Sequence, residues 1–270
     1  MVGVRNEYFG TEAQKALQRR AELLWPLVKN DPRFSCHGRA VSISDGELND
    51  ITLQATVAKL IGASAAEGVW AKDKETRKAA LTSEGMITDE YSNWLSTDQT
   101  FDLAQQIVDT RPLKADLTVV EVGAQTSSED MKALDAFTQT CDVLLPMGSF
   151  IRGEARPAVC IFAREPDGRI VGVSGSVHQF HPDHAKGGMC WWGMLATADH
   201  RRGEGIALIL GAMALLAMRD RFGIQKFFTG IREGNTPSEK LCSKLGFVPS
   251  GQHVVLAIDP EVMQSTQVTK

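Results

Sequence analysis

Two arginines and two glycines stand directly before the most apolar stretch of the chain. The segment His200-Arg201-Arg202-Gly203-Glu204-Gly205 precedes the apolar run 206–218. Glycines at the start of a helix let backbone N–H groups converge on an anion, and the helix dipole adds favourable potential. Arginines add charge-assisted hydrogen bonds. The segment therefore predicts a phosphate-binding turn, the alternative being a solvated arginine-rich turn in which glycine only supplies geometry.

The residues that follow this turn exclude two common phosphate motifs. A P-loop needs Lys and then Ser or Thr after its last glycine, whereas Gly205 is followed by Ile206 and Ala207. A dinucleotide fingerprint needs a third glycine or an alanine at position 208, which is Leu208. The phosphate ligand must therefore be of another kind.

The elements that position this turn change character along the chain. Up to about residue 110, apolar residues at helical spacing and capping boxes such as Ser44-x-x-Glu47 predict helices. Beyond that, β-branched strands alternate with helices. The predicted strands are 117–122, 158–164, 169–180, 189–197, 225–230 and 253–258, and the predicted helices are 128–141, 206–222 and 236–246. We therefore expect a helical N-terminal region, 1–112, and a mixed α and β domain, 113–270.

A second motif lies downstream of the turn. Asn235 is followed by Leu241-Cys242-Ser243-Lys244-Leu245-Gly246-Phe247. The two motifs together resemble the GNAT superfamily of acetyl-CoA-dependent N-acetyltransferases. That family has a pyrophosphate loop Arg/Gln-x-x-Gly-x-Gly/Ala, and later an Asn and a helix ending in Leu-Tyr-x-Lys-x-Gly-Phe. The resemblance covers a little over half of the chain. It implies an α+β fold of three layers, with a mixed central sheet flanked by helices, here preceded by the helical N-terminal region.

The resemblance implies where acetyl-CoA would bind as a cosubstrate. Its pyrophosphate would lie on the turn formed by His200, Arg201, Arg202, Gly203, Glu204, Gly205 and Ile206. The pantetheine arm would follow the strand 189–197 near Leu195 and Thr197. Asn235 would hold the arm from the far side, with Ser238 close to it. No metal is expected.

The catalytic acid of the family is not found at its usual position. Cys242 stands where the family has the tyrosine that protonates the leaving thiolate. A thiol with a reference pKa of about 8.5 can donate a proton, but a cysteine on such a helix is more commonly a small buried hydrophobe. The chain has two tyrosines, Tyr8 and Tyr91. A tyrosine acid must therefore come from the N-terminal region, where Tyr91 is the less terminal candidate.

The strand 189–197 offers no carboxylate as a general base. The nearest titratable cluster is His178-Gln-Phe-His181-Pro-Asp183-His184. Its spacing disfavours a metal site, because strand residues 178 and 181 point to opposite faces. His178 is a candidate base, since imidazole titrates near neutral pH; the alternative is a polar strand end. The resemblance implies that residues 142–156 would shape the acceptor pocket, where Arg152 or Arg156 could meet a carboxylate.

Composition narrows the class of protein. The net charge of −4 gives no field that would attract nucleic acid or an anionic membrane. Five cysteines without C-x-x-C spacing indicate neither a disulfide framework nor a zinc site, and favour the cytoplasm. The N-terminus lacks the apolar core of a signal peptide, and the run 206–218 is too short to span a membrane.

The expected function is an N-acyltransferase that moves an acetyl group from acetyl-CoA to a primary amine of a small molecule by direct attack. Such a molecule would be an amino acid, an amine metabolite or an antibiotic. The alternatives are a protein N-acetyltransferase and a non-catalytic acyl-CoA-binding module. The sequence leaves a homodimer open.

Overall fold

One ten-stranded sheet runs through the whole molecule. The computed structural model describes residues 7–263 and 268–269. The strands are β1 (Phe34–Cys36), β2 (Val41–Ile43), β3 (Ala63–Trp70), β4 (Ile87–Ser96), β5 (Thr118–Glu121), β6 (Ala158–Arg164), β7 (Ile170–His178), β8 (Met189–Thr197), β9 (Lys226–Ile231) and β10 (Phe247–Ile258). Their spatial order is β1-β2-β3-β10-β4-β9-β8-β7-β6-β5. The sheet is mixed, because β2 and β3 are parallel, as are β8 and β9, while the other pairs are antiparallel.

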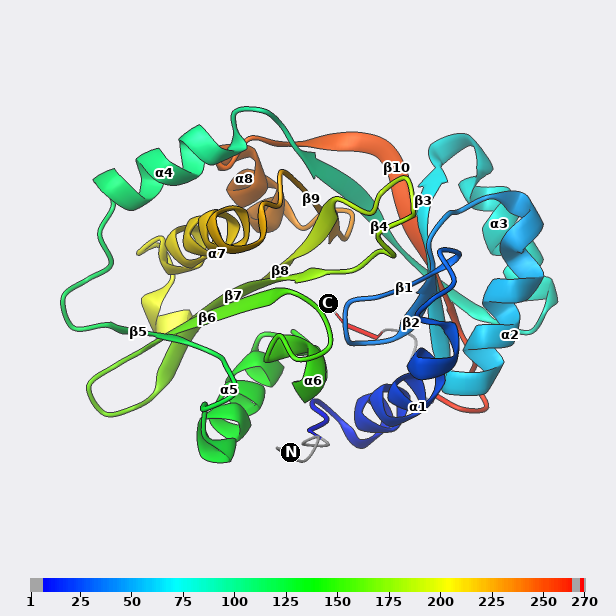
Figure 1. Ribbon diagram of the computed structural model, residues 1–270, viewed down its shortest axis with the longest axis horizontal. Helices are drawn as coiled ribbons and strands as arrows, with labels where there is room; N and C mark the ends of the chain where they lie inside the picture. Colours follow the sequence, from blue (N-terminus) through cyan, green and yellow to red (C-terminus); the bar gives the residue numbers. More distant parts are fainter. Residues whose placement is uncertain (1–6, 264–267, 270) are drawn as a thin grey trace.

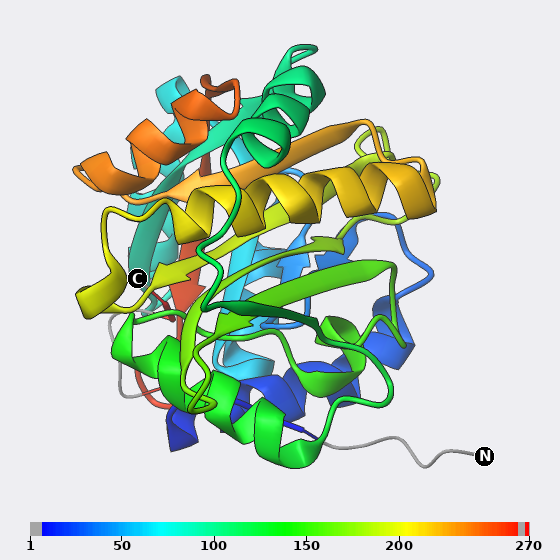
Figure 2. The same cartoon turned by 90° about the vertical axis from the view of Figure 1, so that its left-hand side faces the viewer.

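Helices cover both faces of this sheet. They are α1 (Glu12–Val28), α2 (Ile51–Ile61), α3 (Ala71–Ser83), α4 (Thr100–Thr110), α5 (Ser128–Thr140), α6 (Gly148–Ile151), α7 (Ile206–Phe222) and α8 (Thr236–Lys244). Helices α4, α7 and α8 lie on one face, and α1, α5 and α6 lie on the other (Figures 1 and 2). At one end, α2 and α3 pack on β3 and β10. The predicted three-layer α+β fold is confirmed.

The N-terminal region contributes strands as well as the predicted helices. β1 to β4 all belong to residues 1–112, and β4 lies between β9 and β10 in the sheet. These strands were not predicted, because β3 consists largely of small residues (ASAAEGVW) and β4 is rich in polar ones (ITDEYSNWLS). The region 1–112 is therefore mixed α and β, and it shares its sheet with 113–270.

Helix α7 explains the apolar run 206–218. The helix is buried on most of its sides, because it packs on β6, β7 and β8 and is itself covered by α4. A helix that is apolar all round belongs in such a place rather than at a surface. Among the described residues, no helix is both long enough and apolar enough to cross a membrane.

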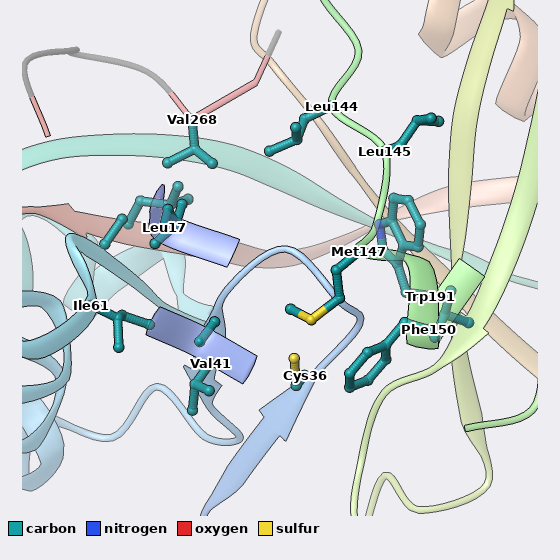
Figure 3. Packing of buried hydrophobic residues seen from close by; sticks show 14 of the residues in the cluster. Leu17, Cys36, Val41, Ile61, Leu144, Leu145, Met147, Phe150, Trp191 and Val268 are labelled. Atoms are coloured by element: carbon teal, nitrogen blue, oxygen red, sulfur yellow. The ribbon is translucent and has the colours of Figure 1, made fainter. Parts of the chain in front are cut away.

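Two apolar clusters lie on opposite faces of the sheet. One surrounds α7, where Trp192 of β8 stacks on Phe247 and donates its indole N–H to the carbonyl of Gly211. The other contains side chains from both parts of the chain, and Figure 3 shows Trp191 of β8 in this cluster with Phe150 of α6. The two neighbouring tryptophans face opposite sides, as strand geometry requires.

Candidate active site

A cavity of about 720 Å3 lies between the diverging ends of β8 and β9 and continues to the N-terminal strands. We call outer end the part lined by exposed or half-exposed residues, and inner end the part lined by residues of the N-terminal strands. The outer end is lined by Arg111, Arg202, Gly203, Gly205, Asn235, Ser238, Lys240 and Lys244. The inner end is lined by His37, Arg39, Ser42, Ser64, Glu67 and Tyr91.

The glycine turn at the outer end has the geometry predicted for it. Gly203 and Gly205 have φ of +85° and +78°, a conformation that side chains with a Cβ rarely adopt. Gly205 is also the N-terminal cap of α7. The first N–H groups of α7 have no partner within the helix, so the positive end of the helix dipole faces the cavity at Ile206.

The basic residues of this turn differ in whether they anchor the turn or line the cavity. The side chain of Arg201 is only 10% exposed and forms ion pairs with Asp116, Glu165 and Glu204. His200 Nε2 lies 3.2 Å from the same Glu165. These contacts tie the turn to its surroundings, and His200, Arg201 and Glu204 do not line the cavity. Arg202 does line it, and its side chain is exposed.

Two lysines and an arginine extend the basic rim beyond the predicted residues. Arg111 follows α4, and Lys240 and Lys244 lie on α8. Their four-residue spacing puts the lysines on one side of the helix. The sequence analysis missed all three, because charged residues at these places are also typical of any solvated surface. Together with Arg202 they give the outer end four positive charges, which suits the phosphates of a nucleotide.

The backbone of β8 is free to bind a ligand along the cavity. β8 pairs with β9 only over Met189–Trp191, and beyond Trp191 no described residue of β9 pairs with it. A β-bulge adds to this opening: Met194 and Leu195 both lie opposite Ser174, and Met194 has φ of +58°. The side chain of Met194 folds over Gly175, where a Cβ would collide with it. Leu195 and Thr197, which β9 does not pair, therefore line the cavity, and the Thr197 carbonyl lies 4.0 Å from the Sγ of Cys141.

Comparison with known proteins matches residues 129–247 to the acetyltransferase (GNAT) family. These residues form a GNAT acetyltransferase domain. The matched segment begins in α5 and ends at Phe247, so it contains α7, the splayed strands β8 and β9, and α8. The recognition based on the two motifs is confirmed, and the family and fold support acyl transfer in general.

Solved structures show the same fold at low identity. A tandem GNAT protein from the clavulanic acid biosynthesis pathway is 16% identical, with a TM-score of 0.50 over 80% of this chain and 74% of that one. A GCN5-related N-acetyltransferase from Kribbella flavida is 15% identical, with a TM-score of 0.53 over 90% and 95%. A functionally unknown conserved protein from Staphylococcus epidermidis is 10% identical, with a TM-score of 0.51 over 96% of both chains. No curated protein matches the chain.

Both candidate acids, Cys242 in the GNAT domain and Tyr91 outside it, line the cavity. Burial raises the pKa of the Cys242 thiol to about 12, and the side chain packs in the apolar cluster around α7. Tyr91 comes from β4 and reaches the same cavity. Its hydroxyl donates to the carbonyl of Thr269 at 2.7 Å and accepts from Arg232 at 2.9 Å. Burial and the neighbouring Asp89 raise the pKa of Tyr91 to about 12, so the hydroxyl keeps its proton at neutral pH.

The candidate base His178 lies away from the cavity lining. Its Nε2 donates to the carbonyl of Gly187 at 2.5 Å, which closes the loop between β7 and β8. Burial lowers its pKa, so the imidazole stays neutral. This geometry corresponds to the alternative interpretation, a polar residue at the end of a strand.

The two arginines expected near the acceptor, Arg152 and Arg156, contact other residues of the protein instead. Arg152 is buried, and it pairs with Glu7 and donates to the carbonyls of Gly123 and Thr126. Arg156 lies over the ring of Trp25, 5.3 Å from its centre. Neither lines the cavity, although the nearby segment 140–143 does in part.

A buried carboxylate at the inner end was missed by the sequence analysis. Glu67 of β3 is only 4% exposed, and its Oε1 accepts a hydrogen bond from Gln179 at 2.8 Å. Its Oε2 is buried and has no hydrogen-bond partner. Burial raises the pKa of this carboxyl above its usual range. The missed signal was a single acidic residue within a run of small ones, which points to a charged group facing inward.

Proposed function

We propose that this protein transfers an acetyl group from acetyl-CoA to the primary amine of a small molecule. The observation that carries the proposal is the continuity of the cavity: the glycine turn, the edge of β8 beyond Trp191, Tyr91 and Glu67 all line the same space. Each of the groups that direct transfer requires is therefore present along a single path.

At the outer end, the residues present fit coenzyme A. The N–H groups from Gly203 to Ile206 would bind the pyrophosphate, with Arg202 and the other rim cations neutralising charge. The pantetheine arm would pair with β8 at Leu195 and Thr197, and Asn235 and Ser238 would border it. Asn235 also caps α8 by accepting from the N–H of Ser238, at 3.3 Å, so its side chain is held in place.

At the inner end, the chain's own residues supply the proton transfers. The acceptor amine must be neutral to attack the thioester carbon, and Glu67 would take up its proton. The C–N bond forms as the C–S bond breaks, and backbone N–H groups at the β8 bulge would stabilise the developing oxyanion. Tyr91 would donate its proton to the departing thiolate, with Cys242 as the alternative donor.

The enclosure of the inner end favours a small acceptor over a protein surface. Glu67 and Tyr91 are only 4% and 7% exposed, and strands β2 and β3 cover this part of the cavity. An acceptor that reaches them must lose most of its hydration, which suits a molecule of metabolite size. The cysteines that the structure describes are all free thiols, which fits a reducing compartment such as the cytoplasm.

The proposal is tested by two measurements on the full chain. Calorimetry with coenzyme A should show saturable binding, and a panel of primary amines with acetyl-CoA should release free thiol faster than hydrolysis alone. Binding without turnover on any amine would favour the non-catalytic acyl-CoA-binding module. Turnover confined to peptides would favour a protein N-acetyltransferase, and absence of binding would refute acyl transfer altogether.

A further inference from the structure

Arg39 brings an uncompensated positive charge to the inner end of the cavity. It lies in the connection between β1 and β2 and is 9% exposed. No described residue accepts a hydrogen bond from its guanidinium or pairs with it, and its Nε is buried without a partner. A buried charge is costly unless it is paired, so an arginine kept in this state is suited to a ligand of opposite charge.

The surroundings hold the guanidinium in place without neutralising it. It lies over the ring of Trp191, 4.6 Å from the ring centre, and His37 stacks on the same tryptophan at 4.7 Å. Burial and the nearby Arg39 lower the pKa of His37 to about 3, so the imidazole remains neutral. A flat aromatic support fixes the plane of a guanidinium and leaves its N–H groups free for a carboxylate.

Asp89 and Glu67, two acidic residues near the inner end, have hydrogen-bond partners other than Arg39. Asp89 holds Arg232 through two hydrogen bonds of 2.6 and 2.7 Å. Glu67 bonds to Gln179, and no ion pair joins it to Arg39 among the residues that the structure describes. Burial lowers the pKa of Arg39 to about 10, which still leaves it charged at neutral pH. Among the residues that the structure describes, the charge therefore has no acidic partner.

We propose that Arg39 binds a carboxylate of the acceptor, so that the acceptor is an amino acid or a similar molecule with both an amine and a carboxylate. The inference rests on the proposed function and names the substrate class of the same site. The carboxylate would accept two parallel hydrogen bonds from the guanidinium above Trp191. The amine would then lie toward Glu67, the acidic inner residue with a buried unpartnered atom.

The test measures binding of acylated products, which does not depend on turnover. N-acetylated α-, β- and γ-amino acids and their carboxamides are titrated into the full chain by calorimetry, with and without coenzyme A. Each pair has the same shape and differs only in the negative charge. We expect at least one carboxylate to bind tenfold or more tightly than its carboxamide. Arg39→Met should bring the two within about threefold of each other, since a charge-assisted bond is lost.

Two further variants complete the experiment. Arg39→Lys keeps the charge without the planar fork and should retain part of the preference. Arg33→Met is the control, because Arg33 precedes β1, is exposed and pairs with Asp31; it should leave the preference unchanged. The proposal is overturned if no carboxylate in the panel is preferred, or if Arg39→Met keeps the preference. If Arg39→Met fails to fold, the wild type still tests the proposal, because equal binding of carboxylate and carboxamide would overturn it.

The failure of this inference and that of the proposed function look different. Coenzyme A binding together with transfer to amines that lack a carboxylate, unaffected by Arg39→Met, would leave acyl transfer intact and refute the carboxylate subsite. A carboxylate preference that depends on Arg39, in a chain that binds no coenzyme A, would support the subsite and refute acetyl transfer.

Discussion

The outer and inner ends of the cavity are built by different means. At the outer end, ligand-binding capacity comes from backbone: glycines with positive φ, the start of α7 and the unpaired edge of β8, surrounded by exposed cations. At the inner end it comes from buried side chains that each have a polar atom without a partner among the described residues, namely His37, Arg39 and Glu67. The outer end belongs largely to the GNAT domain, and the inner end to the N-terminal strands.

This difference separates phosphate binding, which is general, from acceptor selection, which is specific. Backbone groups and solvated cations bind phosphates with little regard to the rest of the molecule. Buried unpaired side chains discriminate strongly, because a ligand that does not complement them leaves them desolvated and unsatisfied. We therefore expect changes at the outer end to alter coenzyme A affinity, and changes at the inner end to alter the rate and the choice of acceptor.

The largest effect is expected from Glu67→Gln, which removes the proposed proton acceptor. Loss of a positioned general base should lower kcat by roughly 100-fold or more. In the wild type, kcat/KM should fall as the pH drops, through a limb that lies above the usual range of a glutamate, because burial raises its pKa. The limb should vanish in Glu67→Gln. Glu90→Gln is the control, because Glu90 is paired with Lys74 and Lys78 outside the cavity; an equal loss there would contradict the assignment.

Tyr91→Phe should produce the next largest effect, again at the inner end. We expect a decrease in kcat of about tenfold to 100-fold, with coenzyme A affinity preserved, measured by thiol release and calorimetry. The alkaline side of the rate profile should stay flat to about pH 10, since the pKa of Tyr91 is raised to about 12. Cys242→Ala examines the other donor. If kcat fell only in Cys242→Ala and not in Tyr91→Phe, the Cys242 thiol would be the proton donor.

Gly203→Val should weaken coenzyme A binding without changing the acceptor preference. A β-branched residue is strongly disfavoured at φ of +85°, so the turn must rearrange. A cost of about 2 kcal/mol corresponds to roughly a thirtyfold rise in Kd. Gly85→Val has the same φ and the same open surroundings, in the turn before β4. It should cost similar stability but leave Kd unchanged; a similar rise in Kd would mean that the loss is global.

The last prediction concerns stability rather than binding or catalysis, and it is the contribution of His37 at acid pH. Its folded-state pKa of about 3 lies below the unfolded value, so only the unfolded state binds a proton between about pH 6.5 and 3. The stabilisation is complete above pH 6.5 and is lost as the pH falls. His37→Gln should reduce the slope of unfolding free energy in this window by up to about 1.4 kcal/mol per pH unit. An unchanged slope in denaturant titrations would show that His37 is protonated in the folded state.

The glycine turn and the neighbouring strand and helix of the outer end could be predicted from the sequence because their signals are local. The glycine turn, the strand 189–197 and α7 lie next to one another in the chain, and their spacing carries the geometry. The strand bounds 158–164 and 189–197 were confirmed to the residue. A local signal still failed at Ser44-x-x-Glu47, where Glu47 is the N-terminal cap and no side chain caps the helix. The bulge at Met194 also left no local trace.

The inner end could not be predicted because its residues meet only through the sheet. Arg39, Glu67 and Trp191 are far apart in the sequence and belong to strands or connections whose neighbours are set by the topology. A lone arginine or glutamate is normally a solvated residue. Only the fold shows that these two are buried. Tyr91 was reached in the sequence analysis by elimination, and the placement of β4 brings it to the cavity.

The position of β4 between β9 and β10 has a consequence for how the molecule is made. The N–H of Phe227 donates to Ser96 Oγ across 131 residues of sequence, and β10 must also pair with β4. The closing of such distant pairs is slow, since the loop entropy has to be overcome before the contacts form. The central strands, and with them the cavity, should thus be completed only after β10 has been synthesised. Before that point the cavity lacks Val254 and Leu256, which β10 contributes to its lining.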